Sequence, residues 1–130
     1  MSRGAVSSRL VLYCVVSMAI RLNKPWRALG NAEVASLPGQ LGVYEIADGN
    51  GGVRFIGMAG GRSLFGLRGE LQRELDARGG DAGWCFRVEV TMSYLTRYQE
   101  LLMVYVADHG DVPDENRGTL PVTLGRLHPA

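Results

Sequence analysis

The most constraining feature of this 130-residue chain is a five-residue turn between two short apolar segments. The turn, Asp48-Gly49-Asn50-Gly51-Gly52, reverses a chain easily, because Gly and Asn accept positive φ at little cost. Residues 41–46 (LGVYEI) and 53–57 (VRFIG) flank it and are rich in β-branched and aromatic side chains. The sequence therefore predicts a β-hairpin here.

A helix is predicted after the hairpin, from Ser63 as its N-cap to about Arg78. Its apolar face is marked by leucines three or four residues apart, Leu64, Leu67, Leu71 and Leu75. Gly66 and Gly69 interrupt this pattern, and each weakens a helix by about 1 kcal/mol relative to Ala. We therefore expect an irregular first turn or a close approach of backbone there. Two ion pairs are expected along the helix, Glu70–Arg73 and Glu74–Arg78.

Three further elements complete the pattern. Residues 84–92 (WCFRVEVTM) alternate and predict a third strand, and Ser93 then caps a helix to about Asp108. The core stripe of that helix is expected to hold Tyr94, Leu95, Tyr98, Leu101, Leu102, Tyr105 and Val106. Asn31 caps a short helix that Pro38-Gly39 ends. The predicted fold class is α+β, a small three-stranded antiparallel sheet flanked by helices.

Length and charge bound the function. The chain suits one domain, which we divide into an N-terminal arm with a short helix (1–37), the main domain (38–117) and a tail (118–130). The net charge of +1 is divided, because residues 1–41 carry +4 and residues 42–117 carry −4. This distribution lacks the broad basic face of a strong non-specific DNA binder. Cys14 and Cys85 are expected to be reduced thiols, as in a cytoplasmic protein.

The apolar run Leu10–Ile20 is too short for a membrane span, which needs about 20 residues. It is either a buried strand or short helix, or it precedes a true translation start at Met18. The second reading makes residues 1–17 no part of the protein and lowers the net charge to −1. No partner in a membrane is expected.

The hairpin carries two tripeptides, Gly42-Val43-Tyr44 and Phe55-Ile56-Gly57, with Phe55 eleven residues after Tyr44. They resemble the signature of the GIY-YIG nuclease superfamily. The similarity extends over roughly residues 38–117, because Arg68, Glu100 and Asn116 follow in the order that the family shows. The resemblance implies a GIY-YIG-like fold and a metal-dependent DNA endonuclease.

The chemistry of phosphodiester hydrolysis explains these residue types. By the resemblance, Glu100 holds a single divalent cation, Mg²⁺ or Mn²⁺, which stabilises charge on the phosphate. Arg68 clamps the scissile phosphate with its planar guanidinium, and Arg62 is the rival for that role. By the same resemblance, Tyr44 orients or activates the water molecule that attacks the phosphate. Asn116 supports the site through hydrogen bonds to backbone.

Two residues depart from the family pattern. Phe55 stands at the second signature tyrosine and has no hydroxyl, and Gln72 stands where the family often has His or Tyr. Neither side chain is a useful base at neutral pH. The alternative is therefore a catalytically degraded relative that binds nucleic acid or protein. A chain of this size would bind DNA only weakly alone, so a protein partner or a homodimer is expected. A third reading makes the tripeptides coincidental in an ordinary α+β protein.

Overall fold

The computed structural model describes residues 21–80 and 83–118. Within these residues there are four strands, β1 (Arg27–Ala28), β2 (Gly42–Ala47), β3 (Val53–Ala59) and β4 (Cys85–Val90). The helices are α2 (Asn31–Ala35), α3 (Gly66–Ala77) and α4 (Tyr94–His109), followed by the 3₁₀ turn η2 (Asp114–Asn116). The α+β class is confirmed.

The sheet is antiparallel throughout, in the order β1-β4-β2-β3. The predicted hairpin is β2–β3, and the Asp48 carboxylate stabilises its turn by accepting hydrogen bonds from the backbone N–H groups of Asn50 and Gly52. The sheet has four strands where three were predicted. The extra strand, β1, consists of two residues paired with Phe86 and Cys85, which is too short for any periodicity to reveal.

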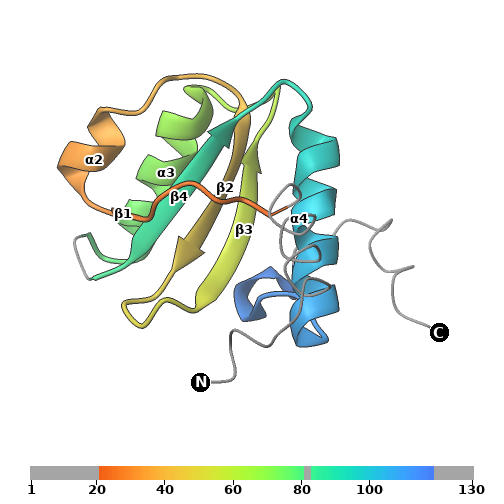
Figure 1. Ribbon diagram of the computed structural model, residues 1–130. Coiled ribbons are helices and arrows are strands. Elements are labelled where there is room, and N and C mark those ends of the chain that lie inside the picture. The colour runs from red at the N-terminus through yellow and green to blue at the C-terminus, as the bar shows by residue number, and fades with distance from the viewer. Residues whose placement is uncertain (1–20, 81–82, 119–130) are drawn as a thin grey trace, which may run out of the picture.

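Helices cover both faces of the sheet (Figure 1). On one face, α2 and α3 pack on alternate residues of β2 and on Phe86 of β4. That core contains Val34, Leu37, Tyr44, Ile46, Leu67, Leu71, Leu75 and Phe86. On the other face, α4 packs through Tyr98, Leu101 and Leu102 on Val43 and Ile56. The central strand β2 is therefore buried on both sides, with all six residues shielded from solvent.

For two leucines, the prediction that they lie in the core is wrong. Leu64 is 89% exposed and Leu95 is 48% exposed. Helix α3 begins only at Gly66, two residues after Leu64, so Leu64 never joins the apolar face. The irregular first turn was expected and is present, because Gly66 has φ +57°. A Cβ at Gly66 would lie 2.5 Å from the carbonyl oxygen of Gln40, so the backbones approach too closely for any side chain.

Ser93 precedes α4 as predicted, whereas the other two predicted N-caps are wrong. Gly30 precedes α2 in the position expected for Asn31, and the Ser63 hydroxyl donates to Glu70 instead of capping α3. Both ion pairs predicted along α3, Glu70–Arg73 and Glu74–Arg78, are confirmed.

The apolar run, Cys14 and the choice between Met1 and Met18 lie outside the described residues, as does most of the tail. Cys85 is a free, half-buried thiol. Among the helices of the two described ranges, none is both long and apolar enough to cross a lipid bilayer.

Candidate functional site

The two signature aromatics lie together on the α3 face of the sheet. Tyr44 and Phe55 come from paired strands, and their ring centroids are 6.1 Å apart. Gly57 pairs with Tyr44, and a Cβ at Gly57 would lie 2.4 Å from Cζ of the Tyr44 ring. The glycine of the second tripeptide is thus required because the tyrosine ring lies over it.

The Tyr44 hydroxyl is committed to an internal partner. It donates to Oε2 of Glu74 on α3 at 2.9 Å, and the residue is 2% exposed. Burial, together with the adjacent carboxylate, raises the pKa of Tyr44 well above its ordinary value. The hydroxyl therefore stays protonated at neutral pH and does not serve as a base for a water molecule at the surface.

The predicted phosphate clamps lie on the β3–α3 loop and the first turn of α3. Arg62 and Arg68 are both exposed. Arg68 donates to the carbonyl oxygen of Leu37 at 3.4 Å, and neither guanidinium has a carboxylate partner in the described part of the chain. Between them lie two exposed apolar side chains, Leu64 at 89% and Phe65 at 59%. We call Arg62, Leu64, Phe65 and Arg68 the loop surface.

The loop is held in place from two directions. The Gly60 N–H donates to the Ser63 hydroxyl at 3.1 Å, and that hydroxyl donates to Glu70 of α3 at 2.7 Å. The Gly61 N–H donates to the Tyr94 hydroxyl of α4 at 3.1 Å. Backbone hydrogen bonds to fixed side chains reduce the number of conformations that the loop can adopt. The loop surface is therefore presented by an anchored loop.

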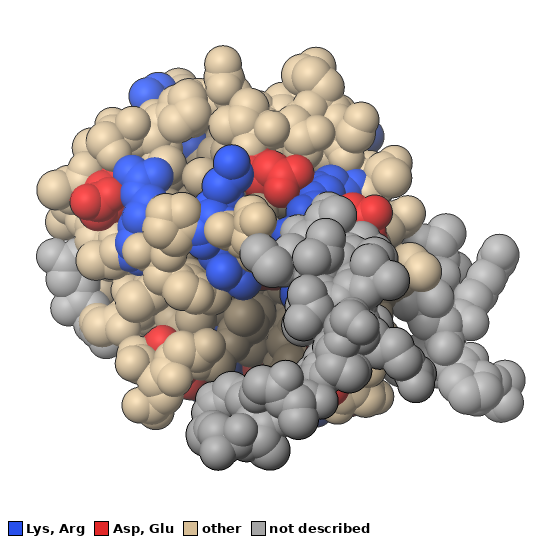
Figure 2. All heavy atoms as spheres, viewed as in Figure 1, with Lys and Arg blue, Asp and Glu red and all other residues tan. Residues whose placement is uncertain are grey.

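The absence of a carboxylate partner distinguishes Arg62 and Arg68 from the other arginines that the structure describes. Ten of the described basic residues are arginines, and eight of these have a carboxylate within ion-pair distance, the exceptions being Arg62 and Arg68. Lys24 also has no carboxylate partner among the residues that the structure describes. Figure 2 shows the resulting alternation of basic and acidic side chains across one face of the molecule. Paired charges attract an anionic ligand less than unpaired ones do. The attraction therefore comes mainly from Lys24 and from the two unpaired arginines, and only the arginines belong to the loop surface.

The predicted metal ligand, Glu100, lies on α4 and so on the opposite side of the sheet from Tyr44. Arg97 contacts the Glu100 carboxylate and also contacts Glu89 of β4, at 3.0 Å. The Arg97 side chain is 12% exposed. A guanidinium therefore occupies the position between two carboxylates that a divalent cation would need.

These residues do not fit the cation that the resemblance implies. Across residues 21–80 and 83–118, no three His, Cys, Asp or Glu side chains are grouped so as to hold a metal ion. Glu100 keeps 45% of its side chain exposed and already has a positive partner. Binding a metal here would require Arg97 to leave, at the cost of two ion pairs.

The two remaining predicted site residues make internal hydrogen bonds. Gln72 donates to Asp76 one turn along α3, at 3.0 Å. Asn116 is fully buried, and its amide pairs with both backbone groups of Ile56, accepting from N–H and donating to C=O at 2.9 Å each. Asn116 thus binds the outer edge of β3 as a neighbouring strand would, and presents nothing to a substrate.

The structure therefore brings together only part of the predicted set. Tyr44 and Phe55 lie on one face, Glu100 on the other, and Arg62 and Arg68 at the end of the sheet.

One comparison with known proteins gives a match. A family model described as a domain of unknown function, DUF7508, matches residues 20–108, which is more than half of the chain. The chain belongs to the DUF7508 family. No curated protein and no solved structure matches it. The DUF7508 region contains the whole sheet and all of the helices α2 and α3, together with the loop surface, whereas Asn116 lies beyond it.

Two functional partners were missed by the sequence analysis. Glu74 was expected to pair with Arg78 and does so, but its second role as the acceptor of the Tyr44 hydroxyl was not foreseen. Its position one residue before the buried Leu75 was an available signal, since neighbouring positions border the apolar face. Arg97, three residues before Glu100, was the second available signal, because residues three apart meet on a helix.

Proposed function

We propose that this DUF7508 chain is a GIY-YIG-like module that binds nucleic acid through the loop surface and does not hydrolyse it. The proposal depends on one observation. Arg62 and Arg68 have no carboxylate partner and flank an exposed Phe65, whereas the hydrolytic candidates Tyr44 and Glu100 have internal partners.

The loop surface has the chemistry that a single strand needs. Guanidinium groups bind phosphate oxygens with paired hydrogen bonds, and an exposed aromatic ring offers a face on which a base stacks. Each phosphate neutralised contributes about −0.7 to the logarithmic salt slope for a single strand. Two arginines therefore give a slope of about −1.4 and weak binding, in line with the small net charge.

Fluorescence anisotropy with a labelled single-stranded oligonucleotide tests the proposal. We expect binding at low salt that weakens as salt rises, and loss of most of it in the double variant Arg62→Ala/Arg68→Ala. Lys24→Ala is the matched control, because it removes an exposed cation elsewhere in the molecule. Absence of binding at low salt, or equal losses in the double variant and the control, would overturn the proposal.

A nicking assay separates binding from hydrolysis. Supercoiled plasmid is incubated with the protein and Mg²⁺ or Mn²⁺, beside Glu100→Ala. We expect no nicking by the wild type. Nicking that disappears in Glu100→Ala would replace the proposal by the endonuclease prediction. Phe55→Tyr, which restores the missing hydroxyl, should remain inert because Arg97 still neutralises Glu100.

A further inference from the structure

A cavity of about 230 Å³ lies on the opposite side of the sheet from Tyr44 and its α3 contacts. Its floor is the α4-facing side of β2 and β4, its wall is the C-terminal half of α4, and the turn between β2 and β3 closes one end. Glu45 and Arg87 line the floor, and Leu101, Val104 and Tyr105 line the wall. At about 30 Å³ for each water molecule, the volume corresponds to roughly eight water molecules, which is room for a small ligand.

Glu45 is an unusual residue for this position. It is 6% exposed in the centre of the sheet, between the apolar residues Val43 and Ala47 of the same strand face. Arg87 contacts it through Nε and Nη2, both at 2.8 Å and both to the same carboxylate oxygen, Oε1. The second oxygen, Oε2, accepts no hydrogen bond from the residues that the structure describes. Burial raises the pKa of the Glu45 carboxyl, and Arg87 opposes that shift.

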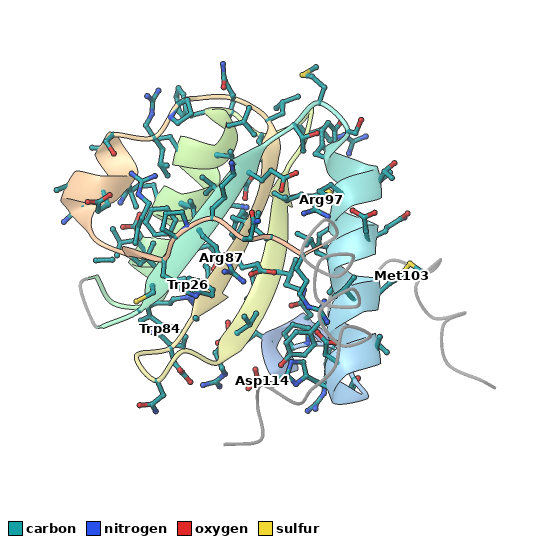
Figure 3. The ribbon with its side chains drawn as sticks, in the orientation of Figure 1. Trp26, Trp84, Arg87, Arg97, Met103 and Asp114 are labelled. Atoms are coloured by element: carbon teal, nitrogen blue, oxygen red, sulfur yellow. The ribbon has the colours of Figure 1, made fainter. Side chains whose placement is uncertain are left out.

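Arg87 has a structural role of its own. Its guanidinium lies 4.1 Å from the Trp26 ring centroid and donates to the Lys24 carbonyl, so it fastens the segment before β1 to the sheet (Figure 3). This role explains Arg87 and Oε1 of Glu45. It explains neither the cavity, which Glu45 lines, nor the second oxygen of the Glu45 carboxylate.

Charge balance restricts the ligand. The cavity lining holds two carboxylates, Glu45 and Asp108, and each is paired with an arginine, Arg87 and Arg21. A ligand with a net charge would place an uncompensated charge beside the buried Glu45–Arg87 pair, which is costly. A zwitterion adds no net charge and offers both a donor and an acceptor.

We propose that this cavity binds a free α-amino acid with a small apolar side chain. Its ammonium donates to Oε2 of Glu45, and its carboxylate accepts from the N–H groups of Arg87 that the three contacts above leave unused. The two charged groups of an α-amino acid are neighbours, as are those of the Glu45–Arg87 pair. The side chain then contacts Leu101 and Val104 of α4.

L-Leucine is the probe, titrated in the millimolar range into the ¹⁵N-labelled full chain and followed by NMR. We expect shifts in the β2 and α4 amides. Two analogues test the class, 3-methylbutylamine, which lacks the carboxylate, and 4-methylpentanoate, which lacks the ammonium. Each should bind at least about tenfold more weakly, since each loses a hydrogen bond to a charged group.

Two variants, with a control, test whether leucine binds in this cavity. Glu45→Gln should weaken leucine binding at least about tenfold. Val104→Trp fills the cavity from the α4 side, keeps Glu45 and should abolish binding, whereas Met103→Trp, on the outer side of α4, should bind as the wild type does (Figure 3). The proposal is overturned if leucine causes no shifts, if either analogue binds equally well, or if Val104→Trp still binds. Because none of these residues belongs to the loop surface, the result is independent of nucleic-acid binding.

Discussion

Replacing Asn116 by Ala tests how the outer edge of β3, where no further strand of the sheet pairs, is stabilised. The Asn116 side chain is fully buried and forms two hydrogen bonds of 2.9 Å with the N–H and C=O groups of Ile56. Ile56 is itself fully buried. The Asn116→Ala variant leaves one backbone donor and one acceptor buried without a partner.

The magnitude follows from those two groups. An unsatisfied buried polar group costs about 1–3 kcal/mol, so the pair costs about 2–6 kcal/mol. Native domains have only about 5–15 kcal/mol of stability, and this loss is therefore a large fraction of the total. With an m-value of about 1.5 kcal/mol per M in urea, a loss of about 3 kcal/mol lowers the unfolding midpoint by about 2 M.

Urea unfolding followed by circular dichroism measures the midpoint, with Asn50→Ala as the control. Asn50 is exposed in the β2–β3 turn, where its backbone N–H, retained in the variant, makes the contact to Asp48. We expect the control to move the midpoint by no more than a few tenths of a molar unit. An Asn116→Ala shift as small as that of the control would show that the amide does not stabilise the β3 edge.

Three further predictions concern single residues. Gly66→Ala should destabilise the protein by about 2 kcal/mol or more, measured by urea unfolding, since it combines positive φ with a backbone clash at 2.5 Å; an unchanged midpoint would contradict this. Arg97→Ala should create weak Mn²⁺ binding between Glu89 and Glu100, detectable by electron paramagnetic resonance and absent from the wild type. The Glu45 carboxyl should titrate above its ordinary value in ¹³C NMR. The folded state then keeps the Glu45 proton to a higher pH than the unfolded state does. The contribution of this residue to stability should therefore fall as pH rises from the ordinary pKa of a glutamate to the higher pKa of folded Glu45.

The elements of the fold were largely predictable from local pattern. The Asp48–Gly52 turn and its flanking apolar residues specified the hairpin, and the spacing of Leu67, Leu71 and Leu75 specified α3. These signals depend on neighbours along the chain, so they need no tertiary information. Strand β1 escaped because two residues form no period, and its pairing with β4 is a contact distant in sequence.

The candidate site was less predictable, because its residues depend on partners from other elements. In the sequence, Tyr44, Phe55 and Glu100 follow the order on which the resemblance to GIY-YIG nucleases depends. The order of residues along the chain does not reveal which face of the sheet a side chain reaches. Tyr44 became a buried donor to Glu74 only when α3 packed on β2, and Glu100 gained Arg97, which also bridges to β4, only when α4 packed on the other face.

The sequence by itself determined the hairpin, the amphipathic helices and the irregular start of α3 at Gly66. The tertiary structure decided which charged groups have partners on other elements, such as Arg97 with Glu89 and Arg87 with Glu45. Among the predicted site residues, Arg62 and Arg68 have no carboxylate partner in the described chain. Glu45 was not a predicted site residue, and folding buries it at the edge of a cavity. The physical reason is range, because turn and helix preferences act over a few residues, whereas burial and ion pairing depend on groups that meet only after the chain folds.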